Sequence, residues 1–406
     1  MRRTHSLTRL SLLLLLAALR TAAAEYFVST YGRDTEAGSM EHPFATLRRA
    51  QEAARPGDTV WLRGGTYTQR EEQIARRNKI WASVILLDRS GEPGRPIRYA
   101  AYGGERVIFD FSAVRPPGFR VSAFHTTGSW LHLEGFEITG VQVTLTGHTQ
   151  SICVENAGSH NRFERLVMRD GMAIGYYSTR GANNLVIHCD ACRNDDPVSD
   201  GGRGGNVDGF GCHPARGGTN NVFRGCRAWF NSDDGYDCIN AHEPVVFEAC
   251  WAFWNGFGPG FEKRADGNGF KAGGYGSTPA ERLPRPIPRH AVRRCFAFGN
   301  KAAGFYANHH PGGCDWIGNT ACRNAKDFSL LGRLADNRTD VPGCGHLLVS
   351  NATCRGRMNL VNIATNRCTL TENRFGEAWP RLDERLLTAP RAPDGSLPAL
   401  PPPFAR

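Results

Sequence analysis

The chain contains 406 residues, of which 40% are hydrophobic and 22% are charged, and its formal net charge at pH 7 is +10. A modest basic excess suits a polyanionic partner without identifying one. The sequence has no run of arginine or lysine interleaved with aromatic residues, so its composition does not favour a nucleic-acid partner.

The first 24 residues are typical of a secretory signal peptide. Arg2, Arg3 and Arg9 form a basic start, residues 10–19 are apolar, and residues 22–24 are alanines suited to cleavage. The apolar stretch is too short to cross a membrane, and no later stretch is long and apolar enough to do so. We therefore expect residues 1–24 to be removed and the mature chain to be secreted without attachment to a membrane, with the periplasm as the alternative location.

Residues 25–67 predict the cap of a repetitive fold. The pattern predicts a strand over residues 25–29, a short amphipathic helix over residues 42–54, and a strand followed by a turn over residues 59–67. This order resembles the N-terminal cap of many right-handed parallel β-helix proteins. Such a cap is needed because the first coil would otherwise expose its core and its strand edges.

From about residue 85 the chain consists of short alternating strands between Gly, Asn and Asp turns, which argues against a βαβ architecture. The pattern Cys-x-Ala-x-x-Asn recurs in four copies, which end at Asn194, Asn231, Asn255 and Asn300. A fifth copy has Asn319 in place of the cysteine. Uninterrupted copies are 24 residues apart, and longer intervals contain insertions at residues 195–206, 256–267 and 276–290. A period in the low twenties with one alternating strand pattern per repeat predicts a parallel β-helix.

The recurring side chains predict the interior of the coils. One asparagine per coil suggests a ladder in which each side-chain amide bonds to the next across the ~4.8 Å strand spacing. The recurring cysteines suit small buried positions. The alternative, a zinc or redox site at Cys189 and Cys192, lacks a second ligand pair at zinc spacing. The sequence has 13 cysteines, and their spacing does not specify disulfide pairs.

We therefore predict an all-β fold, a right-handed parallel β-helix over residues 25–388 with a short N-terminal helical cap over residues 25–67. Residues 389–406 are rich in proline and predict a tail or an edge cover. Unrelated strands of a β-sandwich, the alternative, do not explain a repeat that keeps cysteine, alanine and asparagine at fixed positions.

An acidic cluster lies at the centre of the repeats. Three Gly-aromatic pairs can be aligned as successive coils: Gly209-Phe210, Gly235-Tyr236 and Gly269-Phe270. This alignment places Asp208, Asp234 and Asn268 in one column, and Asp237 and Lys271 in a second. With Asp233, four carboxylates then lie in one patch, where they would repel one another without a cation. Ca²⁺ prefers such hard oxygen ligands, and the lack of His and Cys in the cluster argues against zinc or copper.

The motifs around this cluster look like those of polysaccharide lyase family 9, a family of pectate lyases built on a right-handed parallel β-helix. The resemblance spans about a third of the chain, and its motifs are residues 208–210, 226–229, 231–237, 266–274 and 308–313. It implies a calcium-dependent pectate lyase that acts on the acidic polysaccharide polygalacturonate (pectin), and we expect the chain to be a monomer. It also implies roles for individual residues: Lys271 is the catalytic base, and the calcium ligands are Asp208, Asp233, Asp234 and Asp237.

The chemistry of β-elimination explains why a cation and a lysine belong together. The C5 proton of a uronate is weakly acidic, and a cation on the carboxylate stabilises the charge that develops when that proton leaves. The base must be neutral, so the pKa of a lysine has to fall from ~10.4 to about 7–8. A nearby cation favours that fall, whereas Asp237 opposes it. The role of Lys271 as base therefore depends on bound calcium, and the alternative role is an ion pair with Asp237 at the surface.

Other polar and aromatic residues near the cluster have alternative interpretations. Asn268 and Arg264 are candidate contacts for substrate carboxylates, although Arg264 lies in an insertion and could be solvated. We interpret His309 and His310 as turn residues rather than an acid–base pair. The positions of Trp229, Trp251 and Trp254 in the repeat indicate packing or outer-face contacts rather than sugar stacking.

Two other functions compete with the lyase. The first is a non-catalytic polysaccharide-binding or adhesion module in which the aspartates form a structural calcium site. The second is a β-helix glycoside hydrolase that uses Asp233 and Asp234 as its carboxylate pair. The hydrolase would produce reducing ends without unsaturation, and the binding module would give no product.

Overall fold

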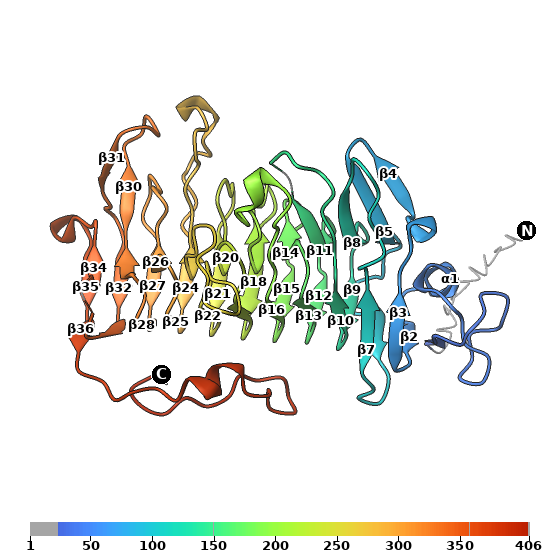
Figure 1. Cartoon of the computed structure of the whole chain (residues 1–406). Coiled ribbons are helices and arrows are strands. Elements are labelled where there is room, and N and C mark those ends of the chain that lie inside the picture. The colour runs from blue at the N-terminus through green and yellow to red at the C-terminus, as the bar shows by residue number, and fades with distance from the viewer. Residues whose placement is uncertain (1–22, 149, 357, 405–406) are drawn as a thin grey trace, which may run out of the picture.

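The computed structural model describes residues 23–148, 150–356 and 358–404, which form a long right-handed parallel β-helix (Figure 1). Three sheets run along its length, with twelve, eleven and eleven strands among the described residues. Successive coils add one strand to each sheet in turn, so neighbouring strands of a sheet come from neighbouring coils. This arrangement confirms the predicted fold. The predicted signal peptide lies outside the described residues, except for residues 23 and 24.

The three sheets are named here A, B and C. Sheet A contains β1 (Glu25–Val28), β2 (Thr59–Leu62), β6 (Ile97–Ala101), β9 (Leu131–Glu134), β12 (Arg162–Glu164), β15 (Leu185–Ile187), β18 (Asn221–Arg224), β21 (Val245–Glu248), β24 (Ala291–Arg293), β27 (Asp315–Ile317), β32 (Leu347–Val349) and β35 (Thr369–Thr371). Sheet B contains β3 (Gly65–Thr68), β7 (Val107–Asp110), β10 (Glu137–Thr139), β13 (Val167–Arg169), β16 (Asp190–Cys192), β19 (Arg227–Trp229), β22 (Trp251–Phe253), β25 (Phe296–Phe298), β28 (Thr320–Cys322), β33 (Ala352–Cys354) and β36 (Arg374–Glu377).

Sheet C contains β4 (Arg76–Asn78), β5 (Trp81–Leu87), β8 (Arg120–Thr126), β11 (Ser151–Asn156), β14 (Ala173–Ser178), β17 (Phe210–Cys212), β20 (Tyr236–Asp237), β23 (Phe270–Lys271), β26 (Ala303–Tyr306), β29 (Lys326–Ser329) and β34 (Leu360–Val361). Its first strand, β4, is antiparallel to β5. A separate antiparallel hairpin joins β30 (Leu331–Arg333) and β31 (Asp340–Pro342). The helices are α1 (Leu47–Ala53) and the 3₁₀ turns η1 (Glu71–Gln73), η2 (Asp200–Gly202), η3 (Ala280–Arg282), η4 (Thr365–Arg367) and η5 (Glu384–Thr388).

Tight turns fix the phase of the repeat. The residue before a recurring cysteine has a positive φ, as at His188 (55°) and Ala249 (51°), and so does the residue before a ladder asparagine, as at Phe230 (52°) and Trp254 (56°). These left-handed residues turn the chain at the two ends of each strand of sheet B. The cysteine and the asparagine that follow them therefore face the interior in each coil that carries the repeat.

The predicted asparagine ladder is confirmed. The Nδ2 amide of each ladder residue donates to Oδ1 of the next one, with distances of 3.0, 3.1, 3.0 and 2.9 Å along Asn194, Asn231, Asn255, Asn300 and Asn324. The cysteines of the repeat are fully buried, as predicted. Two cysteines outside that column, Cys322 and Cys354, form a disulfide between β28 and β33.

The core beneath sheet C is a stack of aromatic rings. The rings of Phe210, Tyr236, Phe270 and Phe305 come from successive strands, and their centroids are 5.0, 4.6 and 5.2 Å apart. All four side chains are fully buried. Because these rings repeat at one register position, they set the phase of the outward-facing residues on either side of them.

The N-terminal cap differs in detail from the prediction. The helix α1 begins at Leu47 rather than at residue 42, because Phe44 is extended and pairs with Val28 of β1. The side chain of Thr46 then caps the helix by accepting a hydrogen bond from the Arg49 amide at 3.2 Å. The predicted strand and turn over residues 59–67 are two strands, β2 and β3, which belong to different sheets.

The C-terminal segment lies against sheet B. After β36 the chain runs back below the coils (Figure 1). Leu400 and Phe404 pack with Trp251 and Phe296 in one apolar cluster, and Arg391 reaches Asp190 of β16. Among the described residues no helix is both long and apolar enough to cross a membrane.

Candidate metal and catalytic centre

The predicted columns are present on the outer face of sheet C. Phe210 of β17 pairs with Tyr236 of β20, which pairs with Phe270 of β23, so the three Gly-aromatic pairs are in register. The next position pairs Asp237 directly with Lys271. The alignment of the sequence therefore predicted the stacking of these coils correctly.

Three of the four predicted metal ligands come together in one buried group. Asp208, Asp234 and Asp237 each offer a carboxylate oxygen, and these atoms all lie within 4.8 Å of one another. The three residues are 5%, 0% and 4% exposed. Backbone amides hold two of them in place: the Asp234 amide donates to Asp208 Oδ1 at 3.1 Å, and the Ile239 amide donates to Asp237 Oδ1 at 2.6 Å.

Asp233 has a different environment. Its Oδ2 accepts a hydrogen bond from the Asn206 amide at 2.9 Å, and its Oδ1 accepts one from the Asp266 amide at 3.0 Å. Both partners lie at the ends of the two insertions that border the acidic cluster. Burial and the charge of Asp234 raise the pKa of Asp233 to about 7. The carboxylate thus ties the two insertions to the short turn between β19 and β20.

Lys271 lies over the carboxylate group. Its Nζ is 3.0 Å from Asp234 Oδ2 and 3.0 Å from Asp237 Oδ2, and its side chain is 13% exposed. Burial lowers the pKa of Lys271, but the charges of Asp234 and Asp237 outweigh burial and raise it well above its usual value. In this arrangement the lysine is an ammonium ion that compensates two aspartates.

The residues of this group fit a hard divalent cation. All three donors are carboxylates, and no His or Cys belongs to the group, which suits Ca²⁺ rather than zinc or copper. Asp234 Oδ2 is buried and receives no well-aligned hydrogen bond, although it has the ammonium of Lys271 nearby. Burial, together with the neighbouring carboxylates, raises the pKa of Asp208 well above its usual value. A cation would relieve that repulsion.

The two predicted substrate contacts are held by protein groups. Asn268 donates from its backbone amide (2.6 Å) and from Nδ2 (2.8 Å) to Asp234 Oδ1, and its own Oδ1 accepts from the Ala303 amide at 3.1 Å. Arg264 donates from Nη2 to Asp195 Oδ1 at 2.7 Å. Asn268 therefore fixes the orientation of the Asp234 carboxylate. Arg264 links the insertion at residues 256–267 to the insertion at residues 195–206.

Sequence reasoning missed two tyrosines in the same row as Lys271. Tyr306 pairs with Lys271 on the next strand, and Tyr177 pairs with Gly211, the partner of Asp237, on the other side. Burial raises the pKa of both phenols to about 12. Each tyrosine follows a Gly-aromatic pair of its own, Gly175-Tyr176 and Gly304-Phe305, so extending the alignment by one coil on either side could have found both.

The two histidines contact loop residues, and the tryptophans of the repeat pack in an apolar cluster, as the sequence predicted. His310 is buried and contacts the Gly274 amide and the Pro288 carbonyl, and His309 pairs with Asp340 at 2.7 Å. Trp229 stacks on Phe253 in the apolar cluster outside sheet B, which also contains Trp251. These indoles lie on a different sheet from the acidic group.

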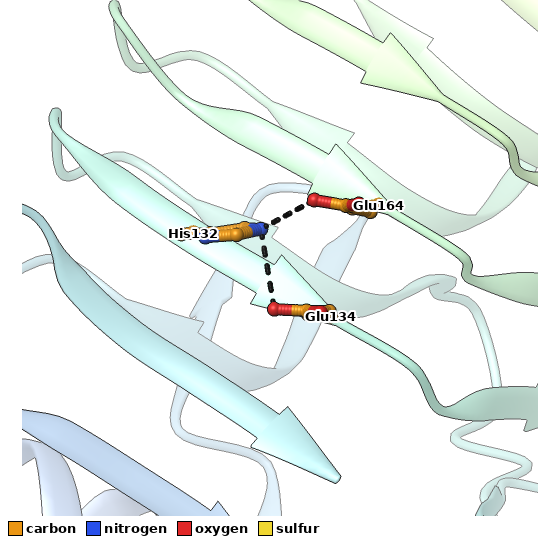
Figure 2. Close-up of side chains that lie close together, drawn as sticks. All are labelled: His132, Glu134 and Glu164. Carbon is orange, nitrogen blue, oxygen red and sulfur yellow. Dashed lines mark hydrogen bonds and ion pairs between the residues drawn. The ribbon is translucent and has the colours of Figure 1, made fainter. Parts of the chain in front are cut away.

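A second group with metal-like spacing lies on sheet A. His132 Nε2 is 3.0 Å from Glu164 Oε2 and 3.5 Å from Glu134 Oε2 (Figure 2). Both carboxylates are already paired with arginines, namely Arg98, Arg162 and Arg165. Three guanidinium groups against two carboxylates leave no negative charge to attract a cation. We therefore interpret this group as an ion-pair network.

A cavity of about 630 Å³ lies at the N-terminal cap, between α1, β3 and β5. Leu47, Tyr67 and Phe109 contribute to its apolar part, and Arg48 and Glu72 are among its polar residues. None of the predicted site residues lines it. No lysine and no carboxylate group with metal-like spacing line this cavity among the described residues, so we place the candidate site at the acidic group on sheet C.

Comparisons with known proteins show the family to which the chain is similar. A family model described as a Pel9A-like, right handed beta helix region matches residues 26–343. The chain is similar to pectate lyase L from Dickeya dadantii, with 31% identity over 382 residues that cover 92% of this chain and 81% of that protein. It is also similar to a solved rhamnogalacturonan lyase, with 41% identity, a TM-score of 0.89, and coverage of 93% of this chain and 95% of that chain. The crystal structure of pectate lyase Pel9A is 28% identical, with a TM-score of 0.72 and coverage of 93% and 88%.

Proposed function

Because the chain belongs to the Pel9A-like family of right-handed β-helix proteins and is a polysaccharide lyase, we propose that it is a calcium-dependent lyase that cleaves polygalacturonate by β-elimination. The observation that carries this proposal is the buried stack of Asp208, Asp234 and Asp237 beneath Lys271. A lone acidic turn would not bring carboxylates from two coils and a lysine from a third onto one face of a sheet.

Lys271 acts as the base. Its Nζ, in the free amine form, takes the C5 proton of a uronate residue. The C5–H electron pair forms the C4–C5 double bond, the bond from C4 to the glycosidic oxygen breaks, and water supplies a proton to the leaving oxygen. The product is an unsaturated uronate at a new chain end.

The aspartates prepare Lys271 for this task. Asp208, Asp234 and Asp237 would hold the calcium ion, with Asp233 as a fourth carboxylate beside them. When bound, the calcium ion supplies positive charge that stabilises the negative charge developing on the uronate carboxylate. Once their charges are engaged in this way, Asp234 and Asp237 no longer hold the ammonium form of Lys271. Its pKa then falls towards the range in which the free amine exists, so we expect activity to rise towards alkaline pH.

Asn268 is a positioning residue in this proposal. Its two donors fix Asp234 Oδ1 and leave Oδ2 turned towards Lys271. Its own Oδ1 is taken up by the backbone of the next coil. We therefore propose that Asn268 acts through Asp234 rather than through the substrate, and that Arg264 keeps the two insertions together.

A second candidate substrate is the rhamnogalacturonan backbone. It is favoured by the similarity to a rhamnogalacturonan lyase, which is higher in sequence identity (41%) than the similarity to pectate lyase L (31%). Its uronate residues offer the same C5 proton, so the elimination chemistry is unchanged. The two candidates differ only in the sugars on either side of the cleaved uronate.

An ultraviolet absorbance assay tests the proposal. The product has a C4–C5 double bond conjugated with its carboxylate and therefore absorbs in the ultraviolet. We expect absorbance to rise when polygalacturonate or rhamnogalacturonan is added with calcium and to stop rising when a chelator is added. New reducing ends without absorbance would favour a hydrolase. Sugar binding with no product at any pH would favour a non-catalytic module.

We also propose that the mature chain is secreted. The pattern of residues 1–24 supports export, and the disulfide between Cys322 and Cys354 suits an oxidising compartment. Mass spectrometry of the protein recovered from culture medium tests this, with an N-terminus near Glu25 as the expected result.

A further inference from the structure

We propose that Tyr306 is the general acid of the elimination, and that its Oη passes to the leaving glycosidic oxygen the proton that water supplies. The inference rests on the proposed function, because it concerns the same reaction at Lys271. It adds a second catalytic residue, on the strand that follows the base in sheet C and on the side away from the aspartates.

Register places Tyr306 directly beside Lys271. The two residues pair between β23 and β26, and the Ala272 amide donates to the Tyr306 carbonyl at 2.8 Å. Paired residues of adjacent parallel strands point to the same face of a sheet, with the strands ~4.8 Å apart. Asp237 of β20 pairs with Lys271 from the other side. The lysine therefore lies in one row between a carboxylate and a phenol.

The lysine side chain leans away from Tyr306. Its Nζ lies 3.0 Å from Asp234 Oδ2 and 3.0 Å from Asp237 Oδ2, and both aspartates lie on the β20 side of β23. Tyr306 lies on the β26 side, its side chain is partly exposed, and its Oη has no hydrogen-bond partner within the described ranges. An amine and a phenol that diverge from neighbouring strands can contact neighbouring atoms of one sugar ring. The amine meets the proton on C5, and the phenol meets the oxygen on C4.

A hairpin of the next coil holds the ring of Tyr306 through His309. The ring of His309 meets the ring of Tyr306 edge-on, with their centroids 6.0 Å apart. His309 Nδ1 lies 2.7 Å from Asp340 Oδ1, which also accepts a hydrogen bond from Arg333 Nε at 2.9 Å. Arg333 and Asp340 pair in the antiparallel hairpin of β30 and β31. His309 is therefore a positioning residue for the phenol.

The turn that brings His309 back against Tyr306 is strained. Asn308 and His309 have positive φ angles of 51° and 58°, and no other two consecutive non-glycine residues do so in the described part of the chain. Asn308 is kept in this conformation by its Nδ2, which donates to the Gly273 carbonyl at 2.8 Å. Left-handed residues that are not glycine are disfavoured, and they gather at sites where one arrangement must be held. Here that arrangement is the contact between the imidazole and the phenol.

The protons balance over one cycle. Lys271 Nζ takes the C5 proton, and the leaving sugar oxygen keeps the electron pair of the broken bond to C4 and takes the proton of Tyr306 Oη. The phenolate then takes a proton from water, and the ammonium of Lys271 returns its own to the solvent. Burial raises the pKa of Tyr306 to about 12. The phenol therefore keeps its proton at the alkaline pH at which Lys271 becomes the free amine.

The test is hydrogen exchange at C5 of an oligogalacturonate in deuterium oxide with calcium present. Tyr306→Phe keeps the ring and removes the acid, so formation of unsaturated product should fall about a hundredfold to ten-thousandfold. Lys271 still removes the C5 proton in this variant, and its amine carries deuterons from the solvent. Mass spectrometry of the uncleaved oligogalacturonate should therefore show deuterium gained at C5 faster than product forms. Lys271→Ala should give neither exchange nor product.

Tyr177→Phe is the matched control, because Tyr177 lies in the same row but three strands away from Lys271. It should leave the ratio of C5 exchange to product formation unchanged. Product formation by Tyr306→Phe at the unmodified rate, or an equal loss of exchange and product, would overturn the proposal.

Thermal unfolding of each variant shows whether the fold is retained. His309→Ala provides a second variant, because it keeps the phenol and removes the ring that holds it, and it should raise the ratio of exchange to product by a smaller factor. Failure of the proposed function is read separately, because the unmodified protein would then give neither unsaturated product nor C5 exchange.

Discussion

Replacing Lys271 with methionine should tighten calcium binding while abolishing turnover. Methionine keeps much of the length of the side chain and removes its charge. Nζ of Lys271 lies 3.0 Å from one oxygen of Asp234 and 3.0 Å from one of Asp237. A calcium ion ~2.4 Å from those oxygens would therefore lie ~5 Å from the ammonium. Across that distance, +1 and +2 charges repel by about 1.7 kcal/mol even at a water-like dielectric constant of ~80.

This repulsion sets the size of the expected effect. A free energy of about 1.7 kcal/mol corresponds to roughly fifteenfold in the dissociation constant for calcium, and a lower dielectric constant at this buried site would enlarge it. Calorimetric titration of calcium at neutral pH measures the change. Lys271→Arg is the matched control, because arginine keeps the charge and cannot lose its proton. It should bind calcium no more tightly than the unmodified protein and should also lack activity.

The pH dependence of binding gives an independent check. Calcium affinity of the unmodified protein should rise as the pH approaches the pKa of Lys271, because the free amine no longer competes for the carboxylates. The methionine variant should lack this rise. Equal or weaker calcium binding by Lys271→Met would refute the reasoning, since it would mean that the lysine and the cation do not share Asp234 and Asp237.

Three further predictions concern the stability of the fold. Asn255→Ala interrupts the asparagine ladder and leaves the Asn231 amide without its acceptor at 3.1 Å; the free energy of unfolding should fall by about 3 kcal/mol in chemical denaturation, and no loss would mean that the ladder is not a source of stability. Acid should destabilise the protein between pH 6.5 and 4, because burial lowers the pKa of His310 and of His346 to about 4. At these two sites the folded state then binds fewer protons than the unfolded state, so each histidine removes roughly 3 kcal/mol of stability as pH falls, and a flat stability profile over this range would contradict it. Arg391→Ala removes one of the two arginines that hold buried Asp190; it should cost about 3 kcal/mol and expose the C-terminal segment to proteolysis, whereas Arg385→Ala, at an exposed pair, should not.

The fold was predictable because its signals repeat. Each copy of the repeat has a left-handed residue before an inward cysteine and another before an inward asparagine. The copies therefore support the same prediction of the coil. Helix α1 has no copy, and its start was misplaced because Pro43 and Phe44 carry helix-like signals but are held in extended geometry by pairing with β1. The disulfide could not be predicted from the sequence, for a related reason. Cys322 and Cys354 are 32 residues apart and meet only because β28 and β33 are adjacent.

The sequence predicted those parts of the site that follow from the register of neighbouring coils. The Gly-aromatic pairs locate Asp208, Asp234, Asp237 and Lys271, and they fix which of these face each other. The pairs do not predict which groups a side chain in these columns bonds to. Asp233 lies one position from Asp234 and outside the aligned columns, and the sequence does not show that it binds two backbone amides. Tyr177 and Tyr306 were missed because the alignment stopped at three coils, although the pairs Gly175-Tyr176 and Gly304-Phe305 continue it on either side.

The arrangement of the insertions explains how such a site can tolerate variation in length. Residues 195–206 and 256–267 both lie between a strand of sheet B and a strand of sheet C, and neither interrupts β17, β20 or β23. The register of Phe210, Tyr236 and Phe270 is therefore set by core packing and is independent of loop length. Asp233, in the short turn of the middle coil, holds the amide at the end of each long insertion, so one carboxylate fixes both loops relative to the row. A change in either loop can alter what reaches Lys271 while the distance between Asp237 and Lys271 stays the same.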